Sequence, residues 1–144
     1  MKNFHAVCVD NFFDNPDKIR EWGLSLPFGK DSMGKWPGKR SEIMHIVDDA
    51  FNQKLVAKIG LAYYGLESMN KVTWDESEIS FQVIKSHKHE NCNKGLIHMD
   101  ANSKDEIGIA GLIYLTPNAN LNSGTSIYKL KENHNFKKKD GKNI

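Results

Sequence analysis

Ile107–Thr116 is an apolar run of ten residues, and we expect the fold of this chain to bury it. No apolar run in the chain reaches the ~18 residues that a membrane-spanning helix needs. The run ends at Pro117–Ser123, where Pro, Asn and Ser favour a turn. The pattern therefore predicts a β-strand that is covered by protein on both of its faces.

Shorter segments with strand-like patterns accompany this run. The clearest is Glu78–Lys85, in which Ile79, Phe81 and Val83 alternate with polar residues and predict a strand with one buried face. The other predicted strands are Phe4–Val9, Ile43–Val47, Leu96–Met99 and Thr125–Leu130. The sequence thus predicts about six strands, most of them in its second half.

The first predicted helix runs over about Asn15–Ser25, where apolar residues recur at helical spacing. Asp14 is the expected N-cap, and Pro16 suits the first helical turn. Pro27 then ends the helix, because proline cannot continue the backbone hydrogen bonds.

The second predicted helix runs over Ala50 to about Tyr64. Asp48 or Asp49 is the expected N-cap, and Gly65 is the expected end. The glycine- and proline-rich stretch Phe28–Ser41 is predicted to be a loop.

The order of these elements, with helices first and strands later, predicts an α+β fold. We expect one domain over residues 1–144. Within it, residues 1–70 form a helical support region, residues 71–130 form a β core, and residues 131–144 form a polar tail. The tail contains the run Lys137–Lys139, which predicts a solvated segment.

Composition narrows the classes of function. A net charge of +2 is nearly balanced, so no nucleic-acid partner is expected. The absence of a long apolar run predicts no membrane partner. Cys8 and Cys92 are too few for a disulfide framework, which predicts a reduced, cytoplasmic setting.

The tripeptide His98-Met99-Asp100 is the strongest chemical signal. Residues i and i+2 of an extended backbone point to the same side, so an imidazole nitrogen and a carboxylate oxygen can bind one metal ion. This pair makes up two thirds of the 2-His-1-carboxylate triad that holds Fe(II) in non-haem oxygenases. We therefore predict that His98 and Asp100 are metal ligands.

Three segments together resemble the prolyl-4-hydroxylase-like branch of the 2-oxoglutarate- and Fe(II)-dependent dioxygenases. They are Gly95–Asp100, which carries the two ligands, the apolar strand Ala110–Pro117, and Ser123–Tyr128, which is similar to the Gly-Gly-x-Thr stretch that opens the next strand of the family. Two segments nearer the N-terminus, Val9–Pro16 and Lys35–Ser41, are similar to small members from phages and marine bacteria.

The resemblance implies a fold, cofactors and a reaction. The fold is a double-stranded β-helix, or jelly roll, on which the N-terminal helices would pack. The cofactors are Fe(II) and 2-oxoglutarate, and the reaction is hydroxylation of a C–H bond in a peptide, protein or small molecule. His98 and Asp100 match the first two metal ligands of the family.

The chain departs from the family pattern after Tyr128. The family has a distal histidine and, beyond it, a basic residue that pairs with 2-oxoglutarate. Here only His134 and several lysines follow, and no arginine occurs after Arg40. We expect a C-terminally incomplete form that lacks both groups; the alternative is that His134 completes the metal site. Missing strands would leave unpaired sheet edges, for which a homodimer is expected.

Other residue groups have simpler interpretations. His87, His89 and Cys92 lack the paired spacing of a structural zinc site, so a solvated loop is predicted, with a lid over the active site as the alternative. Trp36 beside Lys39 and Arg40 is read as a loop whose tryptophan packs on the core; the alternative is a binding surface.

Two other classes of function stay open beside the dioxygenase. The first is a non-catalytic β-domain that serves as a binding or assembly module. The second is a cupin-like metal protein that does not use 2-oxoglutarate. No catalytic residue and no cofactor-binding residue beyond the two metal ligands is assigned from the sequence.

Overall fold

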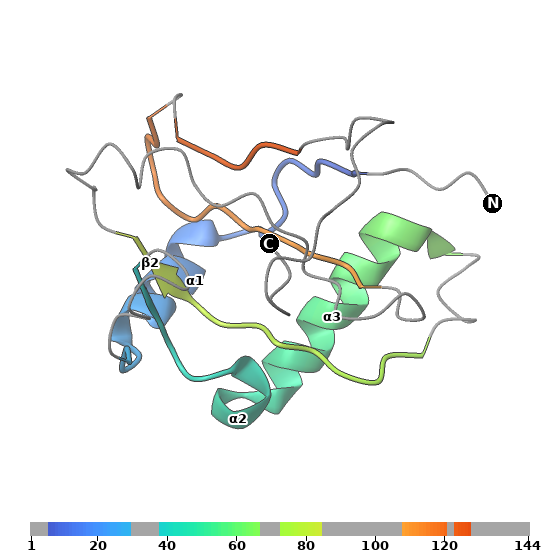
Figure 1. Ribbon diagram of the computed structural model, residues 1–144, viewed down its shortest axis with the longest axis horizontal. Coiled ribbons are helices and arrows are strands. Elements are labelled where there is room, and N and C mark those ends of the chain that lie inside the picture. Colours follow the sequence, from blue (N-terminus) through green and yellow to red (C-terminus); the bar gives the residue numbers. More distant parts are fainter. Residues whose placement is uncertain (1–5, 30–37, 67–72, 85–107, 121–122, 128–144) are drawn as a thin grey trace, which may run out of the picture. The chain divides into compact units, whose positions relative to one another are not determined.

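The computed structural model describes residues 6–29, 38–66, 73–84, 108–120 and 123–127 (Figure 1). The chain divides into two compact units, Met1–Ser86 and His87–Ile144. Each unit is described by itself below. The predicted sites at His87, His89, Cys92, His98, Asp100 and His134, and also Trp36 and Lys137–Lys139, lie outside the described residues.

The first helix, α1, spans Pro16–Ser25 and confirms the predicted helix. Its N-cap is Asn15 rather than the expected Asp14, and the Asn15 side chain accepts a hydrogen bond from the Lys18 backbone N–H at 3.0 Å. Asparagine and aspartate are about equally good N-caps, so the sequence pattern could not choose between these neighbours. Pro16 occupies the first turn as predicted.

A second and a third helix follow closely on each other (Figure 1): α2 (Met44–Val47) and α3 (Asp49–Tyr64). Asp48 is the N-cap of α3, because its side chain accepts from the Phe51 N–H at 2.9 Å. Gly65 ends α3 with a φ of 76°, a conformation that glycine adopts without strain. Both ends of α3 therefore agree with the sequence prediction.

The prediction of a strand over Ile43–Val47 is wrong, since α2 occupies these residues. The Asp48 N–H binds the Met44 carbonyl at 2.8 Å, which closes a helical turn. A short apolar run does not by itself distinguish a strand from a buried helical turn. Here Met44 is fully buried, and its N–H binds the Ile79 carbonyl at 2.7 Å.

The described sheet has only two short antiparallel strands, β1 (Lys39–Arg40) and β2 (Gln82–Val83). Lys39 is opposite Val83, and Arg40 is opposite Gln82. A separate bridge joins Phe28 to Ser41. Within the first unit, residues 39–41 thus lie between two other backbone segments. Residues 28–29 are on one side of them, and residues 81–83 are on the other.

Aromatic rings fill the interior of the first unit. Trp22 of α1 contacts Phe51 of α3 and Phe81, with ring centroids 4.8 and 5.5 Å apart. Phe13 adds a stacked contact to Phe51 at 6.4 Å. Met44, Leu55 and Val56 are the buried aliphatic residues of the described chain. These contacts join α1 and α3 to the segment that carries β2.

The described part of the second unit, residues 108–120 and 123–127, contains no helix and no strand. The predicted strand over Ile107–Thr116 is therefore not formed at residues 108–116, nor is the strand over Thr125–Leu130 at residues 125–127. Figure 1 shows residues 108–116 as an extended segment that is not drawn as a strand.

The predicted fold class, N-terminal helices on a partial double-stranded β-helix or jelly-roll core, is wrong. The regular secondary structure of the described residues is mostly helical, and their only sheet is the open β1–β2 pair. Instead of packing on a jelly roll, α1 places Trp22 against Phe81 and against Phe51 of α3. Alternation of apolar and polar residues indicates which residues suit a strand. A sheet also needs partner strands in register, and the sequence pattern does not specify which segments are partners.

Candidate functional site

The first unit carries an open surface depression of about 330 Å³. Its walls come from two segments that the Phe28–Ser41 bridge holds together. The lining residues are Pro27, Phe28, Gly29, Arg40, Ser41 and Glu42. The Gly29 N–H donates to the Arg40 carbonyl at 3.0 Å, so backbone hydrogen bonding fixes the shape of the depression.

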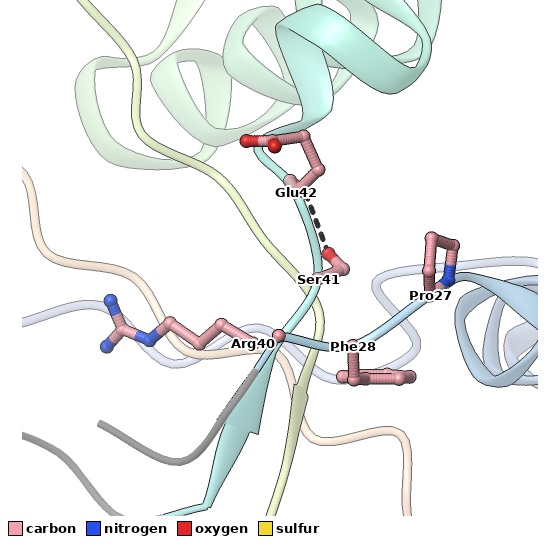
Figure 2. A pocket seen from close by; sticks show the side chains of 6 residues that line it. Pro27, Phe28, Arg40, Ser41 and Glu42 are labelled. Carbon is pink, nitrogen blue, oxygen red and sulfur yellow. Dashed lines mark hydrogen bonds between the residues drawn. The ribbon is translucent and has the colours of Figure 1, made fainter. Parts of the chain in front are cut away.

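The charged groups of this depression project from one strand segment. Figure 2 shows the side chains of Arg40 and Glu42 on one side of the backbone and that of Ser41 on the other. This alternation is the ordinary geometry of an extended chain. Arg40 and Glu42 are exposed, whereas Ser41 is buried. The depression thus has one cation and one anion at its rim.

The hydroxyl of Ser41 has a structural role. It donates to the Glu42 carbonyl at 2.8 Å, the bond drawn in Figure 2, and it accepts from the Phe81 N–H at 3.0 Å. A nucleophilic serine needs an adjacent general base, and no histidine lines the depression. This surface therefore suits contact with a polar ligand better than nucleophilic catalysis.

Within the described ranges, no three His, Cys, Asp or Glu side chains gather to hold a metal ion. His45 is the one histidine inside those ranges. The predicted metal ligands His98 and Asp100 lie outside them, as does the alternative ligand His134. The metal assignment therefore stays a prediction from the sequence.

Two of the segments that carry the family resemblance meet in the second unit. The Tyr114 hydroxyl donates to Thr125 Oγ1 at 3.0 Å. A Cβ atom built on Gly124 would lie 3.9 Å from the same Tyr114 oxygen. The Tyr114 side chain is 63% exposed. The polar contact was missed because it depends on how the chain turns at Pro117–Ser123.

The sequence did not predict a polar pair in the interior of the first unit. Asn52 is 2% exposed, and its Nδ2 donates to Ser77 Oγ at 3.1 Å. The partners are 25 residues apart, so no local pattern reveals them. The contact ties α3 to the chain that leads to β2, and it has no catalytic geometry.

A family comparison covers almost the whole chain. Residues 2–142 match the model described as "Family of unknown function (DUF6445)". The chain belongs to the DUF6445 family. No curated protein and no solved structure match this DUF6445 chain. Within the described part of the DUF6445 protein, no helix is long and apolar enough to span a membrane.

Proposed function

We propose that this DUF6445 protein is an Fe(II)- and 2-oxoglutarate-dependent oxygenase that hydroxylates a C–H bond. His98 and Asp100 are the proposed metal ligands. The observation that carries the proposal is the order of three segments: His98-Met99-Asp100, then Ala110–Pro117, then Ser123–Tyr128. A facial triad needs a third protein ligand beside these two, for which this chain offers His134.

The chemistry of the donor set supports this choice of metal. A neutral imidazole and a carboxylate suit Fe(II) when they leave adjacent coordination positions open. Iron with bound 2-oxoglutarate supplies the oxidising power for hydroxylation. The role of His98 and Asp100 is to hold the metal on one side and leave its other side accessible.

The contact between Tyr114 and Thr125 also supports the proposal. In the family that the chain resembles, the strand matched by Ala110–Pro117 comes directly before the strand that opens with Ser123–Tyr128. Consecutive extended segments are usually neighbours in space. Tyr114 and Thr125 come from these two segments, and their hydroxyls lie 3.0 Å apart. Such a pair of hydroxyls can bind a carboxylate, an alcohol or an amide of a substrate.

The test is calorimetry with the whole protein under anaerobic conditions. Mn(II) replaces Fe(II), because it accepts the same ligands and resists oxidation. We expect 2-oxoglutarate to bind only when metal is present. Loss of a residue that only hydrogen-bonds to a metal ligand typically weakens metal binding by about 10–100-fold. His98→Ala and Asp100→Ala each remove a ligand itself, so each should weaken metal binding by more than that.

His89→Ala and Asp105→Ala are the matched controls, because they remove the same groups from nearby positions. They should leave both affinities unchanged. Metal binding that ignores 2-oxoglutarate would indicate the cupin-like alternative. The absence of any metal binding would reject the proposal and favour a binding or assembly module.

A further inference from the structure

Aromatic rings gather at the C-terminal end of α3. Tyr63 and Tyr64 are the last two residues of the helix, and their ring centroids lie 5.0 Å apart with the planes at 80°. The Tyr64 ring also contacts Trp74, with centroids 6.4 Å apart and the planes at 60°. Trp22 in the interior lies closer to its two ring partners, at 4.8 and 5.5 Å. Tyr64 and Trp74 therefore form a more open pair whose ring planes are steeply inclined to each other.

This aromatic cluster lies at the surface of the first unit. Trp74 is 37% exposed, and Tyr63 and Tyr64 are half-buried. The apolar side chains that flank the two tyrosines along the chain, Leu61 and Leu66, are 42% and 76% exposed. Solvent therefore reaches the cluster, and a small ligand can reach it in the same way.

The charges next to the cluster are negative. The C-terminal end of a helix carries the negative end of its dipole and stabilises cations, and the last turn of α3 contains no basic residue. Asp75 and Glu76 directly follow Trp74 in the chain, and both are exposed. The ring faces, the helix end and the two carboxylates all favour a positively charged ligand.

We propose that Tyr64 and Trp74 bind a quaternary or methylated ammonium group of a small molecule. The negative face of an aromatic ring attracts such a cation, and clusters of aromatic rings are its usual binding sites in proteins. Methyl groups on the nitrogen add apolar surface that the rings can cover, whereas a plain ammonium group is strongly hydrated. Asp75 and Glu76 add Coulomb attraction from the same stretch of chain as Trp74.

The test is a titration of the whole protein with choline as the probe, followed by the indole N–H signals in proton–nitrogen NMR spectra. The signal of Trp74 is the one that disappears in Trp74→Phe. We expect choline to shift this signal in a saturable way, and equal concentrations of potassium chloride to leave it in place. EDTA keeps the sample free of metal, so the result is independent of the metal proposal.

The matched ligand control is the neutral carbon analogue of choline, in which carbon replaces the charged nitrogen. It has the same shape but lacks the attraction to ring faces and carboxylates, so it should bind at least about fivefold more weakly. Equal affinity for the two compounds would overturn the proposal, because it would show a surface that is merely apolar. The absence of a saturable shift with choline would overturn it as well.

Variants of the ring test its part in binding, with the backbone N–H signal of Gly65 as the reporter. Trp74→Leu keeps an apolar side chain but removes the ring, and it should weaken choline binding by about fivefold or more. Trp74→Phe keeps a ring face and should lose less. Circular dichroism should show unchanged helix content in both, because Trp74 lies outside the helices. Unchanged choline affinity in Trp74→Leu would overturn the proposal.

The carboxylates are tested by the double variant Asp75→Asn, Glu76→Gln. It should weaken the binding of choline and leave the binding of the neutral analogue unchanged. Asp17→Asn with Glu21→Gln is the matched control, because it removes the same two charges from α1; it should leave the choline affinity unchanged. Equal loss of choline affinity in the two double variants would show attraction by net charge alone and would overturn the site.

Discussion

Gly23 shows how a single residue can set the distance between two segments. It is buried on α1, and a Cβ atom at this position would lie 2.6 Å from Cε1 of the Phe81 ring. Phe81 cannot easily move away, because the same ring contacts Trp22 at 5.5 Å between centroids. Glycine is therefore required at this position by the close approach of the ring.

Gly23→Ala is expected to lower the free energy of unfolding by up to about 2 kcal/mol, measured by urea denaturation. Replacing glycine by alanine in a helix normally gains about 1 kcal/mol, but overpacking a core costs about 1–3 kcal/mol. Ser25→Ala, at an exposed position of the same helix, should change stability by less than about 0.5 kcal/mol. A more stable Gly23→Ala protein would show that the ring does not pack against this glycine.

Single residues were predictable from the sequence where their role is local. Pro16 in the first turn and Gly65 at the end of α3 are both confirmed, because their backbone preferences act within a few residues. The requirement for glycine at position 23 was not predictable, since the ring that imposes it is 58 residues away in the chain.

At the scale of the element, the start of α3 depends on one side chain. Asp48 accepts from the Phe51 N–H at 2.9 Å, which satisfies one of the donors that the first helical turn leaves unpaired. Asp48→Ala should therefore lower the free energy of unfolding by about 1 kcal/mol. Thermal or urea denaturation monitored by circular dichroism measures the change.

Asp48→Asn separates the hydrogen bond from the charge. Asparagine is as good an N-cap as aspartate, so this variant should keep nearly all of the stability. If Asp48→Asn were as destabilising as Asp48→Ala, the stabilisation would come from the negative charge at the helix N-terminus and not from the cap.

The sequence predicted the helices more accurately than the strands. The predicted helices at 15–25 and 50–64 agree with α1 and α3 to within one residue at each end, because caps and apolar spacing are local signals. Within residues 78–84, the described part of the predicted strand Glu78–Lys85, only β2 (Gln82–Val83) is formed. A strand exists only where a partner lies in register, and for β2 that partner is 43 residues earlier, at Lys39–Arg40.

At the scale of the whole molecule, the same limit explains the error in fold class. The jelly-roll prediction rested on a resemblance in the second half of the chain, and the described residues contain no such sheet. The surface depression was equally hidden from the sequence, because the Phe28–Ser41 bridge that shapes it joins the two ends of a predicted loop. His98 and Asp100 lie outside the described residues, and their assignment as metal ligands stays a prediction from chemistry and spacing.

The metal proposal predicts an effect on the stability of the whole protein. A ligand that binds only the folded state stabilises it by about 2.7 kcal/mol at 100 times its dissociation constant. Mn(II) with 2-oxoglutarate should therefore raise the melting temperature of the wild-type protein, measured by differential scanning fluorimetry. His98→Ala should melt near the wild-type temperature without ligand and show no rise with it. Gly23→Ala, which changes only packing between α1 and Phe81, should melt lower and still show the full rise. An equal rise in His98→Ala would place the metal elsewhere in the chain.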